Sequence, residues 1–339
     1  MFEITRQNAR EYLVGRGLIS SRARVVIELL GGGISNIVMK VSLPDDCFIL
    51  KQSLSKLRVK DDWPFDRERI FVERDCMVLL GELLRPGSVP HLRFSDEENF
   101  VITMSCAMPG GISWKEALLS GEIDLEAAAR VGALLADMHN QTASNEYAQK
   151  RFANQSGFIQ GRIDPYHWTA AKAHPSLKPL IDTEVQRMLR TRVTLVHGDY
   201  SPKNIFIYPE RILMLDFEVA HYGDPAFDTA FCLNHLVLKS IKFPGWSARY
   251  LTAARTFWSA YMDRLMPGLD LEIEYTTIRE LGCLLLARID GKSKIEYIND
   301  EASCNLTREI AKTILRGSET SMESLLTSIG PRIVSSGSV

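Results

Sequence analysis

Three short apolar segments within residues 194–218 constrain the fold of this chain more than any other feature of its sequence. The segments, TLVHGD, IFIY and ILMLDFE, are rich in branched residues and too short to form helices, so they predict three strands. The sequence on both sides of them has mainly the apolar spacing of helices. We therefore expect a small group of strands inside a largely helical region.

The N-terminal part of the chain predicts a larger sheet. Apolar runs within residues 24–53, separated by GGG and PDD, are typical of three antiparallel strands joined by turns. Residues 66–84 carry apolar side chains at helical spacing, and two more short strands are expected at 91–94 and 100–104. Helical patterns dominate from residue 113 onward.

The length of the chain, 339 residues, exceeds the usual size of one compact core, so two lobes are expected. The change of pattern places the first lobe at residues 1–108 and the second at 109–316. Residues 317–339 are rich in Ser and Gly with little periodicity, and we expect them to be frayed or disordered.

The charge balance favours a small molecule as the partner. Forty Lys and Arg residues oppose 42 Asp and Glu residues, so no basic excess indicates binding to nucleic acid. The longest apolar stretch, at 284–287, is far too short to span a bilayer, and the N-terminus lacks the apolar core of a secretory signal. The expectation is a cytoplasmic protein with no membrane partner.

The cysteines form no CxxC pair, which fits reduced thiols better than a zinc site or a disulfide framework. There are six: Cys47, Cys76, Cys106, Cys232, Cys283 and Cys304.

Polar residues with a special spacing follow the strands of the 194–218 region. The sequence His197-Gly198-Asp199 ends the first strand, and Asn204 lies five residues after the aspartate. Asp216 ends the third strand, 17 residues after Asp199. A loop fixed by strands on either side presents its side chains at defined positions, so these residues are candidates for a shared site. The alternative is structural: a turn, a loop cap and a strand end.

This set of residues suits phosphoryl transfer. That reaction needs a base at the attacking hydroxyl, hard oxygen ligands for Mg²⁺ and cations for the phosphates. Asp199 would orient and deprotonate the hydroxyl, while the oxygens of Asn204 and Asp216 suit Mg²⁺ better than a softer ion.

The sequence VHGDYSPKNIFI followed by ILMLDFE resembles the catalytic core of the aminoglycoside phosphotransferase and choline kinase superfamily, small-molecule relatives of protein kinases. The resemblance covers roughly residues 25–297. It implies an α+β, protein-kinase-like fold of two lobes, with an N-terminal antiparallel sheet plus helix and a mainly helical C-terminal lobe. It also implies transfer of the γ-phosphate of ATP, with Mg²⁺, to a substrate hydroxyl.

The same resemblance assigns parts to individual residues. It implies Asp199 as the catalytic base and Asn204 and Asp216 as metal ligands. Asp228, in GDPAFDTAF, is implied to brace the catalytic loop by hydrogen bonds, and His197 to hold that loop rather than carry protons.

The nucleotide is expected to meet three places in the first lobe. At the glycine-rich turn, Gly32, Gly33 and Ser35 would let backbone N–H groups and a hydroxyl approach the phosphates, although the turn departs from the protein-kinase GxGxxG pattern. Residues 105–107, from Ser105 to Ala107, would form the hinge that reads adenine, an inference from their position between the lobes.

The third place is Lys51, a lysine at the end of an apolar strand that needs an acidic partner. Glu73 on the following helix is the expected partner and Glu68 the competing one. This pairing matches the strand lysine and helix glutamate that hold the α and β phosphates in kinases.

The acceptor is expected to be a small hydroxyl compound. Only 11 residues separate Asp216 from Asp228, too few for the activation segment with which a protein kinase docks a peptide. An aminoglycoside, a sugar such as methylthioribose, an amino alcohol and a hydroxy amino acid all stay open. Glu218 is the nearest acid for a cationic acceptor, but one acid is no cluster.

Four further charged residues have two readings. Lys203 reaches a phosphate or is exposed, and Arg288, Asp290 and Lys292 face the acceptor or lie solvated at a helix end. The alternative to a kinase is a catalytically silent nucleotide-binding module of the same fold, which is disfavoured because Lys51 and the three residues of the candidate site are intact.

Overall fold

The computed structural model describes residues 2–31, 35–56, 65–317, 319 and 321–336. It divides into two compact units. The first unit comprises Met1–Gly110 and Leu215–Glu218, and the second comprises Gly111–Met214 and Val219–Val339. The short segment Leu215–Glu218 thus belongs with the N-terminal unit although it lies far along the chain.

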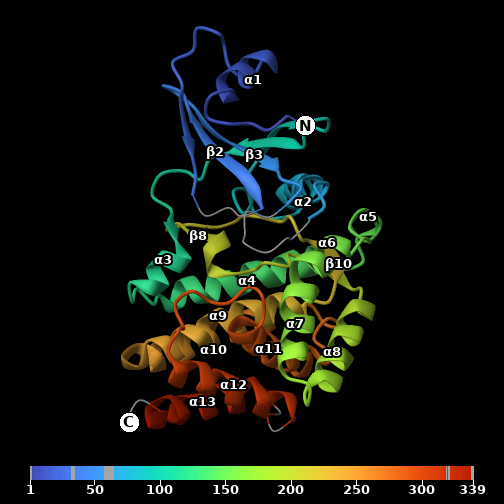
Figure 1. The fold of residues 1–339 in the computed structure, drawn as a ribbon, viewed down its shortest axis with the longest axis vertical. Helices are drawn as coiled ribbons and strands as arrows, with labels where there is room; N and C mark the ends of the chain where they lie inside the picture. Colours follow the sequence, from blue (N-terminus) through green and yellow to red (C-terminus); the bar gives the residue numbers. More distant parts are fainter. Residues whose placement is uncertain (1, 32–34, 57–64, 318, 320, 337–339) are drawn as a thin grey trace. The chain divides into compact units, whose positions relative to one another are not determined.

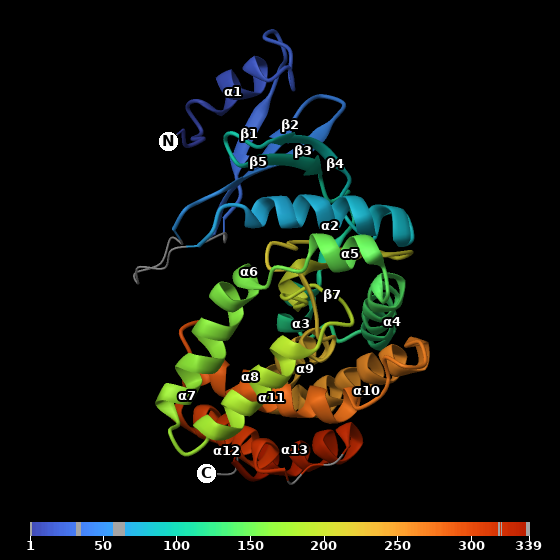
Figure 2. The same cartoon turned by 90° about the vertical axis from the view of Figure 1, so that its right-hand side faces the viewer.

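The first unit is built on an antiparallel sheet of five strands in the order β1-β2-β3-β5-β4 (Figure 1). Alternating residues of β2 point into the core, where Met39 and Val41 are buried with Leu50 of β3. Helix α2 lies beside β3, β4 and β5 (Figure 2). The elements are α1 (Ala9–Gly15), β1 (Val26–Leu29), β2 (Asn36–Ser42), β3 (Cys47–Ser53), α2 (Arg69–Leu83), β4 (Leu92–Asp96) and β5 (Val101–Ser105).

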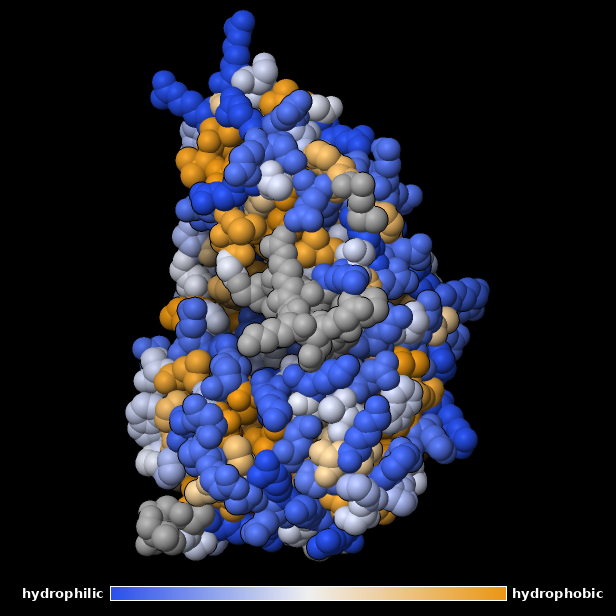
Figure 3. Space-filling model, viewed as in Figure 1, coloured by the Kyte–Doolittle hydropathy of each residue, from blue (hydrophilic) through white to orange (hydrophobic). Residues whose placement is uncertain are grey.

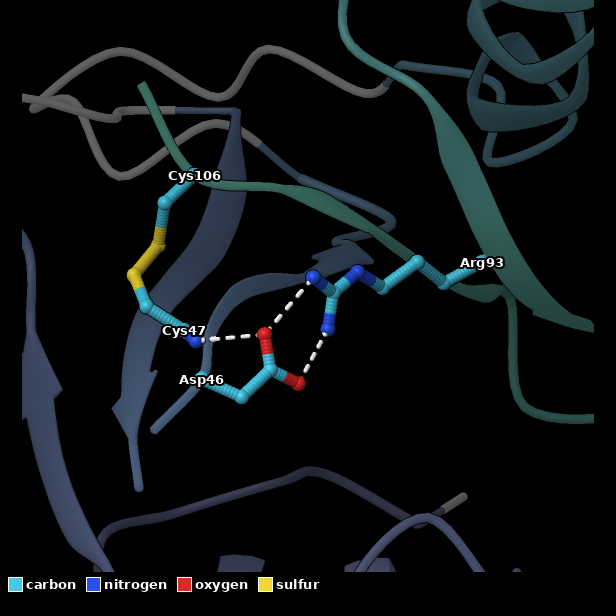
Figure 4. The surroundings of a disulfide bond; sticks show 4 residues. All are labelled: Asp46, Cys47, Arg93 and Cys106. Carbon is cyan, nitrogen blue, oxygen red and sulfur yellow. Dashed lines mark hydrogen bonds and ion pairs between the residues drawn. A yellow bond between two sulfur atoms is a disulfide. The ribbon is translucent and has the colours of Figure 1, made fainter. Parts of the chain in front are cut away.

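The expectation that all six cysteines are reduced is wrong for Cys47 and Cys106, which form a disulfide (Figure 4). Cys47 begins β3 and Cys106 follows β5, and the antiparallel pairing of these strands brings the two Cα atoms to 5.8 Å. The neighbouring Asp46 accepts hydrogen bonds from the Arg93 guanidinium and from the Cys47 N–H. A separation of 59 residues gives no pairing signal in a single sequence. The other four cysteines are in no disulfide.

The second unit is mainly helical, with two small sheets of order β6-β8-β9 and β10-β7. Its elements before the 194–218 region are β6 (Ile112–Ser113), α3 (Trp114–Leu119), α4 (Leu125–Thr142), α5 (Glu146–Arg151), α6 (Ser156–Phe158), the π-helix η1 (Ile159–Trp168), α7 (Thr169–Ala173) and α8 (Lys178–Arg190). Those that follow are β7 (Thr194–Val196), the 3₁₀ turn η2 (Pro202–Asn204), β8 (Ile205–Ile207), β9 (Ile212–Met214), β10 (His221–Gly223), α9 (Ala226–Lys242), η3 (Pro244–Trp246), α10 (Ser247–Arg264), α11 (Ile273–Asp290), α12 (Glu301–Leu315) and α13 (Met322–Ser336).

The three strands expected within residues 194–218 are present as β7, β8 and β9, and the α+β fold is confirmed. Helix α9 lies at the centre of the second unit, where it packs against both α10 and α11 (Figure 1). Every residue of α9 from Ala226 to Ile241 is buried. A helix so enclosed is a rigid support for the residues at its first turn.

The C-terminal segment corrects another expectation. Residues 322–336 form the helix α13, which packs against α10 and α12, instead of a frayed tail. Apolar side chains at helical spacing drive this packing; those buried are Met322, Leu325, Leu326, Ile329 and Ile333. The abundance of Ser and Gly around them masked this pattern.

Within the described residues, no helix is both long and apolar enough to cross a membrane. On the face drawn in Figure 3, hydrophilic residues cover most of the surface and hydrophobic residues occur in small groups.

Candidate active site

The turn after β7 needs a glycine at position 198. Gly198 has a φ of +76°, and a Cβ atom there would lie 2.7 Å from the carbonyl oxygen of Val219. An L-residue would meet both a strained backbone and a steric clash. Gly198 therefore lets the chain reverse and bring Asp199 out of the strand.

The carboxylate of Asp228 holds this turn in place. It accepts hydrogen bonds from the backbone N–H groups of His197 at 2.6 Å and Gly198 at 2.9 Å. Asp228 lies in the first turn of α9, where the positive end of the helix dipole favours a negative charge. The ring of His197 accepts a hydrogen bond at 3.2 Å from the N–H of Asp199 through Nδ1, which is the contact of a residue that holds the loop.

Asp199 lies between two cations. Its Oδ2 is 3.0 Å from Nη2 of Arg162 and 2.8 Å from Nζ of Lys203. The Asp199 side chain is almost buried, whereas the Lys203 side chain is 52% exposed. Lys203 is thus exposed, one of the two alternatives for it, and it also pairs with Asp199, a contact that neither alternative included. The two cations stabilise the ionised carboxylate.

Arg162 is a residue of the site that sequence reasoning missed. It lies in η1, a ten-residue π-helix, and its Nε donates to the carbonyl oxygen of Gly198 at 2.7 Å. One side chain thus holds both the backbone of the turn and the carboxylate that the turn presents. Since π-helical stretches are often found at functional sites, the feature itself points to this region, but the apolar pattern of the sequence does not predict it.

Asn204 ends the same loop in the turn η2. Its amide nitrogen donates to the carbonyl oxygen of Asp199 at 3.0 Å, so the amide oxygen is left for another ligand. The backbone N–H of Asn204 donates to Ser201, which closes the 3₁₀ turn. The loop residues 197–204 are thereby linked to one another at several points.

In the first unit, Lys51 bridges two acids. Its Nζ is 2.6 Å from Oε2 of Glu73 and 2.6 Å from Oδ1 of Asp216. Burial disfavours the charged amine, but Asp216, Glu73 and Glu218 outweigh it, so the pKa of Lys51 rises above its ordinary value. Burial raises the pKa of the Glu73 carboxyl, whereas the charge of Lys51 lowers it. Loss of Lys51 would therefore remove the positive charge that compensates this buried acid. Glu73 is therefore the partner of Lys51, while the competing Glu68 is exposed.

Asp216 is held in an unfavourable backbone conformation, with a φ of +71°. Left-handed conformations of residues other than glycine cost free energy and cluster at ligand sites. The contact with Lys51 is one of the interactions that hold it there.

Glu218, two residues later, is engaged within its own unit. Its carboxylate accepts hydrogen bonds from Oγ of Ser35 at 2.8 Å and Nδ2 of Asn36 at 2.7 Å, and Nε of Arg69 lies 3.2 Å away. The buried Arg69 also donates to the carbonyl oxygens of Ser35 and Leu54. Glu218 thus ties the segment after Asp216 to the end of the glycine-rich turn.

The other residues expected to contact the nucleotide lie in the glycine-rich turn and at the end of β5. Gly32 and Gly33 lie outside the described residues. Ser105 ends β5 and accepts a hydrogen bond from the His91 N–H through its Oγ at 3.0 Å, and Ala107 is half-buried.

Of the charged residues at the C-terminal end of α11 and just beyond it, Asp290 has a structural contact. Its carboxylate pairs with Arg308 at 2.8 Å and with His174 at 2.7 Å. Lys292 is exposed, with its backbone N–H bonded to the carbonyl oxygen of Pro165. Arg288 is buried, and contacts Tyr166 and Ser293.

Comparisons with known proteins identify relatives of this chain. Residues 26–267 match the model of the phosphotransferase enzyme family (APH). A methylthioribose kinase of Pectobacterium carotovorum subsp. carotovorum (strain PC1) is 25% identical over 319 residues, which are 82% of this chain and 78% of the relative. A methylthioribose kinase of Bacillus cereus (strain G9842) is 23% identical over 266 residues, 71% of this chain and 67% of the relative.

Solved structures show the same fold at low sequence identity. An amicoumacin kinase solved with AMP-PNP, Ca²⁺ and Ami has a TM-score of 0.59 at 14% identity, covering 93% of this chain and 96% of that one. An ethanolamine kinase of Plasmodium vivax has a TM-score of 0.56 at 13% identity, covering 97% of this chain and 86% of that one.

The bracing of the loop by Asp228 predicts a loss of stability in Asp228→Asn. Asparagine would place an amide nitrogen where one carboxylate oxygen accepts from His197 or Gly198. The backbone N–H that faced this oxygen would lose its acceptor, at a cost of about 1–3 kcal/mol. Urea unfolding of the purified protein measures this change. Asp137→Asn, which removes a surface ion pair with Arg264, is the matched control and should change stability by less than about 0.5 kcal/mol. Equal stability of the two variants would contradict the bracing contact.

Proposed function

Because the chain belongs to the phosphotransferase enzyme family (APH), we propose that it transfers the γ-phosphate of ATP, with Mg²⁺, to a hydroxyl group of a small acceptor. The observation that carries the proposal is the position of Asp199, whose carboxylate is presented by a braced loop between Arg162 and Lys203. The names of the relatives, which are kinases of small hydroxyl compounds, support the same class of acceptor.

Asp199 orients the acceptor and takes its proton. The acceptor oxygen bonds to the γ-phosphorus as the bond from that phosphorus to the β–γ bridging oxygen breaks; the hydroxyl proton passes to Asp199 and ADP leaves. Arg162 keeps the carboxylate in position. Lys203 is half exposed, so it is able to turn from Asp199 toward the phosphoryl group when substrates bind.

The donor atoms fit a magnesium ion. The side-chain oxygens of Asn204 and Asp216 are hard ligands, and the amide nitrogen of Asn204 is already used by the loop. Bound there, Mg²⁺ would supply positive charge for the β and γ phosphates.

Lys51 binds the α and β phosphates. Glu73 holds the lysine from one side, so that its ammonium group stays charged in a buried place and is directed at the nucleotide. Asp216 accepts a hydrogen bond from the same ammonium group, which the phosphates of a bound nucleotide would share.

Replacement of the base should stop turnover without loss of ATP binding. We expect Asp199→Ala to lower kcat by about 10²- to 10⁴-fold, the usual contribution of a positioned general base, while the Kd for ATP stays the same. ADP release measured against a panel of hydroxyl compounds gives kcat, and titration calorimetry gives the Kd. Asp182→Ala, a surface position on α8, is the control and should keep full activity. Undiminished turnover by Asp199→Ala would refute the assignment, and a silent module would show no turnover in any variant.

Replacement of the metal ligand should act through Mg²⁺. Asp216→Asn is expected to weaken nucleotide binding in the presence of Mg²⁺ at least about 10-fold, a loss seen even for groups that only support a metal ligand. Without Mg²⁺ the affinity should not fall, because the substitution removes a negative charge near the phosphates. Titrations with and without Mg²⁺ measure the difference, and an unchanged dependence on Mg²⁺ would count against the assignment.

A further inference from the structure

Two arginines flank one tyrosine ring beside Asp199. The guanidinium carbon of Arg162 lies 5.7 Å from the centre of the Tyr166 ring, and that of Arg288 lies 5.6 Å from it. Arg162 is the residue that pairs with Asp199. Burial raises the pKa of Tyr166, but the charges of Arg288 and Arg162 outweigh burial and lower it, and the charge of Asp199 also acts on this hydroxyl. Contacts through Tyr166 and Arg162 therefore connect Arg288 to the candidate base.

One edge of the Arg288 guanidinium has no hydrogen-bond partner among the described residues. Its Nη1 donates to the Tyr166 hydroxyl at 3.0 Å and to the carbonyl oxygen and hydroxyl of Ser293 at 2.6 and 3.0 Å. Its Nε is buried and has no hydrogen-bond acceptor, and Nη2 bonds to none of the described residues. The Nε–Nη2 edge carries two parallel N–H groups, which match the two oxygens of a carboxylate or a phosphate. Burying a donor without an acceptor costs free energy, so we expect a ligand to bind at this edge.

A second buried basic residue, Lys239, contacts the segment that follows α11, in which the N–H of Ile295 donates to the carbonyl oxygen of Arg288. Lys239 of α9 is 1% exposed, and its Nζ is 3.5 Å from both the carbonyl oxygen of His235 and the hydroxyl of Tyr297. No carboxylate of the described residues forms an ion pair with Lys239 or Arg288, although buried lysines normally have an acidic partner. Burial, together with the charges of Lys115 and Arg288, lowers the pKa of Lys239 to about 7.

The charges of these basic side chains act together on His235, whose carbonyl oxygen contacts Lys239. Burial lowers the pKa of His235, and four cations act on the ring in the same sense: Lys239, Arg288, Lys203 and Lys115. Lys203 is the residue that pairs with Asp199, and Lys115 pairs with the exposed Glu296 at 2.6 Å. We call Arg162, Lys203, Lys239 and Arg288 the basic group. Its paired members, Arg162 and Lys203, both contact Asp199, so Lys239 and Arg288 remain uncompensated.

We propose that the acceptor carries, besides its hydroxyl, an anionic oxygen group, a carboxylate or a phosphate, that binds the open edge of Arg288 close to Lys239. The inference rests on the proposed kinase function, because it assumes that the acceptor hydroxyl lies at Asp199. A cationic acceptor would be repelled by the basic group, and a neutral one would leave the open edge of Arg288 unsatisfied. The acceptor is thus a hydroxy acid or a hydroxylated phosphate ester, in contrast to the ethanolamine named for one structural relative.

Matched acceptors test the charge directly. ADP release with Mg-ATP is compared for gluconate against glucose, glycerate against glycerol and ribose 5-phosphate against ribose, with ethanolamine and kanamycin as cations. We expect kcat/KM for the best anion to exceed that of its neutral counterpart by at least about 100-fold, with no turnover of the cations. Preference within the anions separates the carboxylate from the phosphate. Equal or better turnover of a neutral or cationic compound overturns the inference and leaves the kinase function standing. Absence of transfer to every acceptor, while Mg-ATP binds, refutes both.

Variants test whether Arg288 binds the anionic group of the acceptor. Arg288→Gln should raise KM for the active anion by about 10²- to 10³-fold with a smaller change in kcat, and Arg288→Lys should recover part of the loss. Arg308→Gln, which removes an arginine that pairs with Asp290 near the same helix end, is the control and should leave KM unchanged. Nucleotide affinity and thermal unfolding report whether each variant is folded. If Arg288→Gln does not fold, Lys239→Met is expected to raise the same KM. An unchanged KM in a folded Arg288→Gln or Lys239→Met variant overturns the inference.

Discussion

The hydrogen bonds from the backbone of His197 and Gly198 to Asp228 determine the geometry on which the site depends. Two N–H groups that a strand partner would otherwise satisfy are turned toward one buried carboxylate at the start of α9. The turn leaves Asp199 outside the sheet, where Arg162 binds both its carboxylate and the carbonyl oxygen of Gly198. Because α9 is enclosed by α10 and α11, the position of the loop is set by the packing of the helical core.

The N-terminal unit solves a different problem, which is to keep a lysine charged while it is buried. Lys51 remains ionised because Glu73 and Asp216 both lie 2.6 Å from it. Nearby, the buried guanidinium of Arg69 also pairs with a carboxylate, that of Glu218, and it connects the end of the glycine-rich turn to this residue. Charge compensation thus organises the parts of this unit that we assign to the nucleotide. In the other unit, no carboxylate of the described residues compensates Arg288 or Lys239, which is the basis of the ligand site that we propose there.

Short-range patterns carried the part of the fold that the sequence predicts. Strand periodicity, turn residues and the HGD spacing depend on neighbouring residues, so β7 to β9 were expected. The pair of Lys51 with Glu73 was expected from the order of strand and helix and from its match to the pair found in kinases. Contacts between distant residues leave no such pattern, which is why the Cys47–Cys106 disulfide and the approach of Arg162 to Asp199 were missed. The helix α13 was missed for another reason, since its apolar spacing was present but was set aside on composition.

A crystal structure with Mg²⁺ and AMP-PNP tests the central claim most directly, namely that Asp199, Asn204 and Asp216 act on one bound nucleotide. The account predicts that the amide oxygen of Asn204 and the carboxylate of Asp216 bind the same Mg²⁺ at about 2.1 Å. It also predicts that Asp199 lies on the acceptor side of the γ-phosphate without binding the metal. A nucleotide whose Mg²⁺ is held by other groups, or whose γ-phosphate lies far from Asp199, would contradict the account.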